Sequence, residues 1–148
     1  MARETLLDFF DDFAESQAEF LVYDDGYRSS TYRYIQVGHA ARAFGKRLRD
    51  AGIGKGDKVV IWSENRPEWI VALWGCLLQG VVLVPIDYRG SRDLLLKLHR
   101  IVESRLVLLG EEVAFPESDS MQTWHLHEVI TLPARGTPPD SAELRGAR

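Results

Sequence analysis

Residues 58–109, KVVIWSENRPEWIVALWGCLLQGVVLVPIDYRGSRDLLLKLHRIVESRLVLL, contain three short apolar runs separated by two helical patterns. The runs show no alternation with polar residues, which is typical of strands buried on both faces of a parallel sheet. Parallel strands joined by helices need right-handed crossovers, which lay the helices on the sheet. The chain is therefore predicted to be an α/β protein, a three-layer αβα arrangement with a mainly parallel sheet. The expected strands are Val59–Trp62, Val81–Ile86 and Leu106–Leu109, and the expected helices cover 67–79 and 91–103.

Three residues mark the boundaries of these two helices. Pro67 suits a first helical position, Gly80 follows the end of the first helix, and Ser91 is a good N-cap for the second. The segment 54–57, Gly-Lys-Gly-Asp, has the composition of a phosphate loop, but it precedes a strand. Because anion-binding loops follow a strand and open a helix, we interpret this segment as a turn. No Gly-x-Gly-x-x-Gly motif occurs in the sequence, which disfavours NAD binding.

Toward the amino terminus, the sequence predicts a helix and a β-hairpin. Apolar residues at three-to-four spacing between acidic residues indicate a short amphipathic helix over 6–14. The β-prone runs 20–23 and 27–32 then flank Asp24-Asp25-Gly26. Asp-Gly in that position is a strong hairpin signal, because glycine tolerates positive φ.

A longer amphipathic helix is expected after the hairpin. Thr31 is the predicted N-cap, and Gly52 is the predicted stop at the carboxyl end. Gly38 and Gly45 lie inside this helix, where each costs about 1 kcal/mol relative to alanine. Their presence predicts close packing against a neighbouring element.

The pattern weakens after Gly110, although 124–126 and 129–132 are each expected to add a strand. The segment 133–148 contains Pro138-Pro139 and almost no large apolar residue, so it cannot bury enough surface to offset its ordering entropy. We predict one subdomain over 1–132 and a linker or disordered tail over 133–148.

The overall composition excludes several classes of protein. The formal net charge of −4, with acidic and basic residues interleaved, offers no positive face for nucleic acid. A single cysteine, Cys76, cannot form an internal disulfide and fits a reducing cytoplasm. The first 15 residues lack the basic start and apolar core of a secretory signal. The longest apolar run, Trp69–Leu78, falls short of the roughly 20 residues that cross a bilayer. We therefore expect a cytoplasmic protein with no membrane span.

Polar residues follow two of the predicted strands, at the edge where open α/β sheets place ligands. Ser63-Glu64-Asn65 follows the first strand, and helix capping by Ser63 or Asn65 is the favoured interpretation over ligand binding. After the next strand come Asp87, Tyr88 and Arg89. His125, His127 and Glu128 lie close in sequence, but they would need further ligands to hold a metal, so no metal site is expected.

The central stretch has a dense set of matches to a known family. GIGKGDKVVIWSENRPEWIVALWGCLLQGVVLVPID, residues 52–87, resembles the early region of adenylate-forming enzymes of the acyl-CoA synthetase type. The resemblance covers roughly 5–132, and the string at 65–69 is most similar to the long-chain fatty acyl-CoA synthetase branch. Family members often complete a capping box with Glu three residues after the Thr cap, whereas Tyr34 stands there in this chain. The matching residues are Gly52, Ile53, Gly56, Asp57, Ser63, Glu64, Asn65, Gly80, Val84, Pro85, Ile86 and Asp87.

The resemblance implies an ATP-dependent ligase that acts in two steps. A carboxylate, expected to be a fatty acid, attacks ATP to give an acyl-adenylate and pyrophosphate, and coenzyme A then displaces AMP. The expected cofactors are ATP, Mg²⁺ and coenzyme A. The phosphate loop, nucleotide motifs and catalytic lysine of the family would lie beyond residue 148. This chain is therefore expected to contain no catalytic residue, to bind no cofactor tightly and to be inactive alone.

The resemblance also implies partners. The remainder of the same enzyme should pack on this region, and apolar surface left without it is expected to associate into a homodimer. In family members the loop at Asp87, Tyr88 and Arg89 can approach the nucleotide part of coenzyme A, and Arg89 could pair with its phosphates. A solvated loop, with Asp87 bonding its own backbone, is the other interpretation.

Two other classes of protein remain open on sequence grounds. One is a free-standing flavodoxin-like module that binds a nucleotide or flavin at its strand ends, although no phosphate loop is present. The other is an interaction fragment that docks on a partner chain through uncovered apolar surface.

Overall fold

The structure is a computed structural model that describes residues 4–114 and 121–132. The predicted linker or tail over 133–148 lies outside these residues. The helices are α1 (Leu6–Phe13), α2 (Tyr34–Asp50), α3 (Pro67–Leu78), α4 (Arg92–Val102) and α5 (Leu126–Val129). The strands are β1 (Glu19–Asp24), β2 (Ser29–Arg33), β3 (Lys58–Ser63), β4 (Val82–Asp87), β5 (Leu106–Leu109) and β6 (Thr123–His125).

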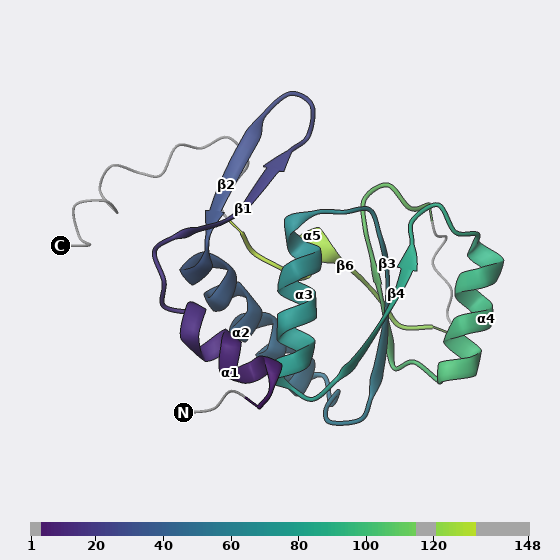
Figure 1. Ribbon diagram of the computed structural model, residues 1–148. Coiled ribbons are helices and arrows are strands. Elements are labelled where there is room, and N and C mark those ends of the chain that lie inside the picture. The colour runs from purple at the N-terminus through teal and green to yellow at the C-terminus, as the bar shows by residue number, and fades with distance from the viewer. Residues whose placement is uncertain (1–3, 115–120, 133–148) are drawn as a thin grey trace.

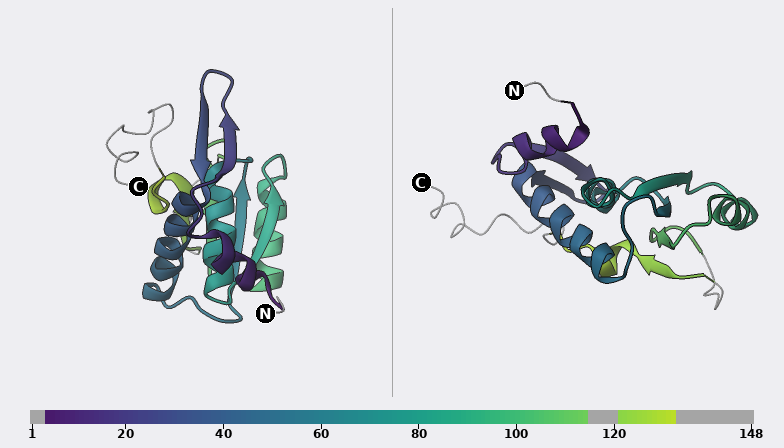
Figure 2. Two further views of the ribbon diagram at one scale, coloured as in Figure 1. Left: turned by 60° about the vertical axis from the view of Figure 1, so that its left-hand side comes forward. Right: turned by 90° about the horizontal axis from the view of Figure 1, so that it is seen from below.

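A four-stranded parallel sheet forms the middle layer of the molecule. Its strand order is β4-β3-β5-β6, so β3 lies between the two strands that follow it in sequence. Helices α2 and α3 cover one face and α4 covers the other, as Figures 1 and 2 show. The predicted three-layer αβα arrangement with a mainly parallel sheet is confirmed.

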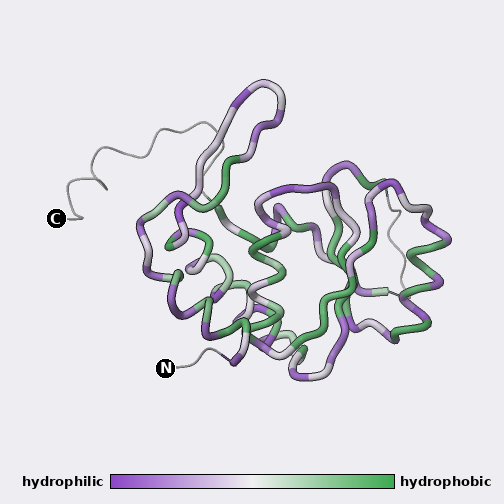
Figure 3. Tube along the Cα trace, in the orientation of Figure 1, coloured by the Kyte–Doolittle hydropathy of each residue, from purple (hydrophilic) through white to green (hydrophobic). Residues whose placement is uncertain are grey.

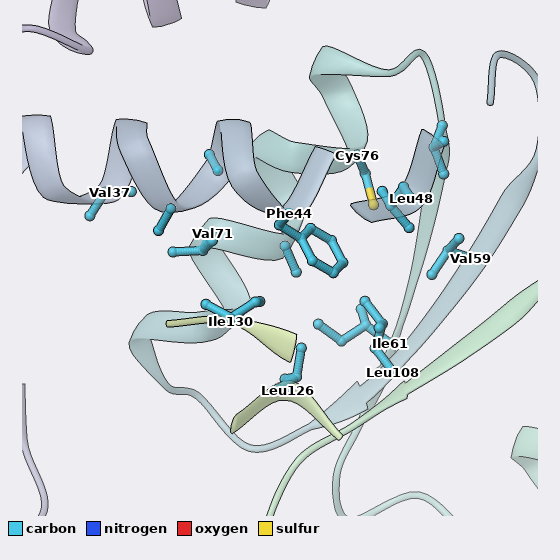
Figure 4. Packing of buried hydrophobic residues seen from close by; sticks show 14 of the residues in the cluster. Val37, Phe44, Leu48, Val59, Ile61, Val71, Cys76, Leu108, Leu126 and Ile130 are labelled. Atoms are coloured by element: carbon cyan, nitrogen blue, oxygen red, sulfur yellow. The ribbon is translucent and has the colours of Figure 1, made fainter. Parts of the chain in front are cut away.

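Alternate residues of the central strands supply two separate cores. Val59 and Ile61 of β3 face α2 and α3, where they pack in a cluster that includes Phe44 and Cys76 (Figure 4). The side chain of Trp62, the next residue along β3, points to the other face of the sheet and belongs to the smaller core beneath α4. Because both faces are covered, β3 is apolar from Val59 to Trp62 and β5 is apolar along its whole length, and Figure 3 shows this concentration of hydrophobic residues along the sheet.

Strand β4 differs from the prediction, because it is not buried on both faces. It lies at one end of the strand order, and Val82 is 48% exposed. Val82 donates its N–H to the carbonyl of Asp57, at 2.8 Å, on the side of β3. Backbone groups alternate along a strand, so Pro85 is turned to the outer edge. Proline is tolerated there because no strand among the described residues lies on that side and needs its missing N–H.

The predicted amino-terminal helix and hairpin are present, and the hairpin projects beyond the sheet (Figure 1). Gly26, at its turn, has a φ of +89°. The predicted cap of α2 was wrong, because Thr31 lies within β2 and the N-cap is Arg33. Gln36 accepts a hydrogen bond from the N–H of Arg33, at 2.8 Å, and takes the place of the expected Glu.

Glycines allow the two helices on one face to lie very close. Gly45 of α2 and Gly75 of α3 face each other, and a Cβ built on Gly75 would lie 2.6 Å from Phe44 Cδ1 and 3.0 Å from the carbonyl oxygen of Ala41. A Cβ on Gly38 would likewise lie 3.0 Å from the carbonyl oxygen of Ala14. The packing predicted from Gly38 and Gly45 is therefore confirmed.

The carboxyl-terminal part is only partly as predicted. Strand β6 extends the sheet beside β5, in agreement with the strand expected at 124–126. The strand expected at 129–132 is absent from the described residues, because the chain turns into the short helix α5 after His125. Within the two described ranges, no helix is both long and apolar enough to cross a membrane.

Candidate functional site

The carboxyl ends of the parallel strands bring several polar residues to one edge of the sheet. Strand β3 ends at Ser63, β4 at Asp87 and β5 at Leu109, and the parallel register aligns these ends. Ligands bind at this edge in open α/β sheets. The structure shows two separate polar groups there, one buried and one exposed.

The buried group is centred on the guanidinium of Arg66, in the loop between β3 and α3. Its Nε and Nη2 bind the Glu68 carboxylate, at 2.7 and 3.4 Å, and its Nη1 binds Glu64 Oε1 at 2.8 Å. Nη2 also binds Glu111 Oε1, at 3.0 Å, from the loop after β5. Only 3% of the Arg66 side chain is exposed. These four residues, called here the Arg66 cluster, tie the end of β3 to the end of β5.

Glu64 is held by backbone as well as by Arg66. Its Oε1 accepts a hydrogen bond from the N–H of Glu111 at 3.1 Å, and its Oε2 accepts one from the N–H of Glu112 at 3.2 Å. Burial acts to raise the pKa of Glu64, but the backbone and Arg66 hydrogen bonds outweigh it and lower that pKa below 4.5. The carboxylate is therefore charged at neutral pH.

Arg66 is also fixed in its charged form. Burial acts to lower its pKa, but the hydrogen bonds to Glu68, Glu111 and Glu64 raise the pKa further above its ordinary value. Because the guanidinium of Arg66 stays charged and is buried, it holds the surrounding carboxylates in fixed positions.

Gly110 makes room for the Glu64 carboxylate. A Cβ at this position would overlap Glu64 Oε2 and Ser63 Oγ. The hydroxyl of Ser63 donates to the carbonyl of Glu64, at 2.8 Å. A glycine is thus needed where the backbone after β5 crosses the end of β3.

The exposed group consists of Asp87, Tyr88 and Arg89 after β4. The Arg89 side chain donates two hydrogen bonds to the Asp87 carboxylate, from Nη2 to Oδ2 at 2.8 Å and from Nε to Oδ1 at 3.1 Å. Asp87 Oδ1 also accepts a hydrogen bond from the backbone N–H of Arg89. The hydrogen bonds from the Arg89 side chain lower the pKa of Asp87 to about 2. Arg89 also lies 5.9 Å from the ring centre of Tyr88. All three predicted site residues are accessible, and they interact with one another.

The capping role predicted for the residues after β3 needs correction. Neither Ser63 nor Asn65 caps α3, because the N-cap is Arg66, and the Arg66 side chain makes no capping hydrogen bond to the backbone. Asn65 is exposed, whereas Ser63 and Glu64 are buried. The chain therefore uses Glu64 to bind the loop after β5, which is a role that the sequence analysis missed.

His127 lies at the margin of the Arg66 cluster. Its Nδ1 is 3.9 Å from Glu111 Oε1, and its Nε2 is 3.9 Å from Glu128 Oε1. The rings of His125 and His127 are 5.8 Å apart. No group of three or more His, Cys, Asp or Glu able to hold a metal ion occurs in the part of the chain that the structure describes.

The sequence of the chain matches one protein family over most of its length. The family described as AMP-binding enzyme matches residues 10–145. The chain is 30% identical over 118 residues to the 3-[(3aS,4S,7aS)-7a-methyl-1,5-dioxo-octahydro-1H-inden-4-yl]propanoyl:CoA ligase of Rhodococcus jostii. This match covers 76% of this chain and 22% of that protein. It is 38% identical over 53 residues to long chain acyl-CoA synthetase 3 of Arabidopsis thaliana, covering 36% of this chain and 8% of that protein.

Solved structures show a similar fold. The O-succinylbenzoate coenzyme A synthetase of Bacillus subtilis, in complex with ATP and magnesium ion, superposes with a TM-score of 0.71 at 22% identity. The match covers 82% of this chain and 33% of that one. The chain thus spans about a fifth of the first curated relative and a third of this structure.

Proposed function

This chain belongs to the AMP-binding enzyme family, and from that premise we propose that it is the amino-terminal portion of an ATP-dependent acyl-CoA synthetase-like ligase. The family match over residues 10–145 is the observation that supports this proposal most directly. The two curated relatives named above join acyl groups to coenzyme A, which supports an acid-thiol ligase. A fatty acid is the proposed carboxylate substrate.

The proposed reaction has two balanced steps. A carboxylate oxygen attacks the α-phosphorus of ATP, and the bond to pyrophosphate breaks to leave an acyl-adenylate. The thiol sulfur of coenzyme A then attacks the acyl carbon, loses its proton, and releases AMP. Developing negative charge in both steps needs positioned donors or cations.

The described residues do not provide a binding site for the Mg²⁺ of this reaction. Glu64 and Glu68, the most buried carboxylates at the strand ends, are both bound by Arg66. We therefore propose that magnesium and the phosphates of ATP bind to other parts of the whole protein. The described residues are proposed to contribute a rigid sheet against which the rest of the enzyme packs.

The loop of Asp87, Tyr88 and Arg89 is the proposed contact with coenzyme A. Because the Arg89 guanidinium is exposed, a phosphate could bind it in place of the Asp87 carboxylate. The exposed ion pair contributes little to stability, so the exchange of partners is easy.

The proposal is tested with ATP–pyrophosphate exchange in the presence of fatty acids. The whole protein should catalyse exchange, whereas the 148-residue chain should not exceed a no-enzyme control. Exchange by the short chain, or none by the whole protein with any carboxylate, would contradict the assignment. In the whole protein, Arg89→Ala should raise KM for coenzyme A and leave exchange unchanged, with Arg28→Ala as the control for an exposed arginine.

A further inference from the structure

In the loop after β5, two consecutive backbone N–H groups donate to the same carboxylate. The N–H groups of Glu111 and Glu112 both point at the Glu64 carboxylate, at 3.1 and 3.2 Å. Successive N–H groups that converge in this way form a concavity that binds anions in many proteins. Here the concavity is occupied by a side chain of the same molecule.

A buried cation completes the surroundings of this carboxylate. Arg66 Nη1 lies 2.8 Å from Glu64 Oε1, and 97% of the arginine side chain is shielded from solvent, since only 3% is exposed. Two backbone donors and one guanidinium donor therefore contact two oxygens of one carboxylate. This donor set is the one that proteins use for carboxylate and phosphate ligands.

We propose that Arg66 and the backbone of Gly110–Glu112 form a carboxylate-binding site, which the chain fills with its own Glu64. The site should accept a small, planar monoanion. Gly110 lies so close to the carboxylate that a Cβ would overlap Glu64 Oε2, so the site is narrow on this side. Glu68 and Glu111 also bind Arg66, and their negative charge disfavours a dianion such as phosphate.

This assignment has a consequence for ligand binding at the sheet edge. With Glu64 in place, the end of β3 is closed to external anions, because the tethered carboxylate competes at a high effective concentration. The exposed loop after β4 is then the part of this edge that remains accessible to a charged ligand. The inference stands on the geometry of the Arg66 cluster and does not depend on the proposed enzyme activity.

The proposal is tested by removing the internal ligand and supplying a small one. Glu64→Ala in the 148-residue chain is unfolded with urea in sodium formate, sodium chloride or sodium phosphate at equal ionic strength. Formate should stabilise the variant by occupying the vacated site. The folded-to-unfolded ratio should rise about tenfold when formate is at ten times its dissociation constant. Phosphate also stabilises folded chains in general, so each effect is compared with that of the same salt on the wild-type chain. Relative to the wild type, chloride and phosphate should not stabilise the variant, whereas formate should.

Two control variants separate a bound ligand from a general salt effect. Glu64→Gln fills the site with a side chain of the same shape, so formate should not stabilise it. Glu15→Ala removes an exposed glutamate that pairs with Arg42 and should also be insensitive to formate. If Glu64→Ala, relative to the wild type, responds equally to all three anions or does not respond to formate, the proposal is wrong.

A direct measurement covers the case in which Glu64→Ala folds poorly. Refolding yield in formate is compared with that in chloride, and the amide signals of Glu111 and Glu112 are followed by NMR during a formate titration. The proposal predicts a higher yield in formate and a saturable shift of both amides. A variant that formate neither refolds nor perturbs at these amides would show that no such site exists.

Discussion

Arg66 and Arg89 each bind a carboxylate two residues away, but one pair is buried and the other is exposed. The Arg66 side chain is 3% exposed and the Arg89 side chain is 74% exposed. Removing one partner of a buried pair leaves an uncompensated charge, which costs about 3 to 5 kcal/mol. Arg66→Met should therefore lower the free energy of unfolding by about 3 kcal/mol. Arg89→Met should leave it nearly unchanged.

Urea unfolding of both variants at neutral pH measures this difference.

The pH dependence of stability gives a second test, because the pKa of Glu64 is lower in the folded chain than its ordinary value of 4.5. A lowered folded pKa adds stability above the unfolded pKa, and this stability is lost as the pH falls through the folded pKa. The wild-type chain should thus lose more stability below pH 4.5 than Glu64→Gln does. Parallel pH profiles of the two proteins would contradict the role given to Glu64.

The sequence predicts these single residues only in part. The positions of Asp87, Tyr88 and Arg89 at the end of a strand follow from the strand pattern, and the structure agrees. The partners of Arg66 do not follow from it, because Glu111 lies 45 residues further along the chain. The spacing Glu64-x-Arg66-x-Glu68 after a buried strand is the one signal that could have indicated an ion cluster.

Among the elements, the contact between α2 and α3 depends on the absence of a side chain at Gly75. Gly75→Ala raises helix propensity by about 1 kcal/mol, but its Cβ would lie 2.6 Å from Phe44 Cδ1 and 3.0 Å from a backbone carbonyl. Overpacking of this kind costs about 1 to 3 kcal/mol, so the variant should be less stable than the wild type.

Ala43→Gly is the matched control, because Ala43 is exposed on α2. It should be less stable by about 1 kcal/mol from propensity alone. In thermal unfolding, Gly75→Ala and Ala43→Gly should therefore both melt below the wild type, although the first raises helix propensity and the second lowers it. A Gly75→Ala variant that melts above the wild type would mean that the two helices can separate without loss.

Elements whose pattern is long or repeated were predicted well from sequence. The β-α-β-α-β order over 58–109 and the hairpin around Gly26 rest on strong signals, and both are confirmed. Short runs are ambiguous, since residues 126–132 fit a strand or a helical turn equally by periodicity. The cap of α2 was misplaced because Thr31 continues the antiparallel pairing with β1, and this tertiary contact outweighs its capping preference.

For the molecule as a whole, several large apolar side chains remain exposed on the described surface. Leu6 and Phe9 of α1 are 57% and 48% exposed, and Ile101 of α4 is 65% exposed. Apolar surface of this kind favours association, and a patch that pairs with its own copy forms a closed dimer. We expect a homodimer of the 148-residue chain, with a mass that doubles as concentration rises in light scattering. A constant monomer mass at high concentration would contradict this expectation, and Leu6→Glu should weaken the dimer if α1 takes part.

The proline in β4 limits how such association can proceed. An outer strand with a continuous row of N–H groups can template further strands and seed aggregates. In β4 the outward row is interrupted at Pro85, in the middle of a strand of six residues. We therefore expect growth of cross-β fibrils from this side of the sheet to be disfavoured when the chain is concentrated with its apolar side chains exposed. Pro85→Val would restore the missing donor, and with it a template for amyloid-like assembly.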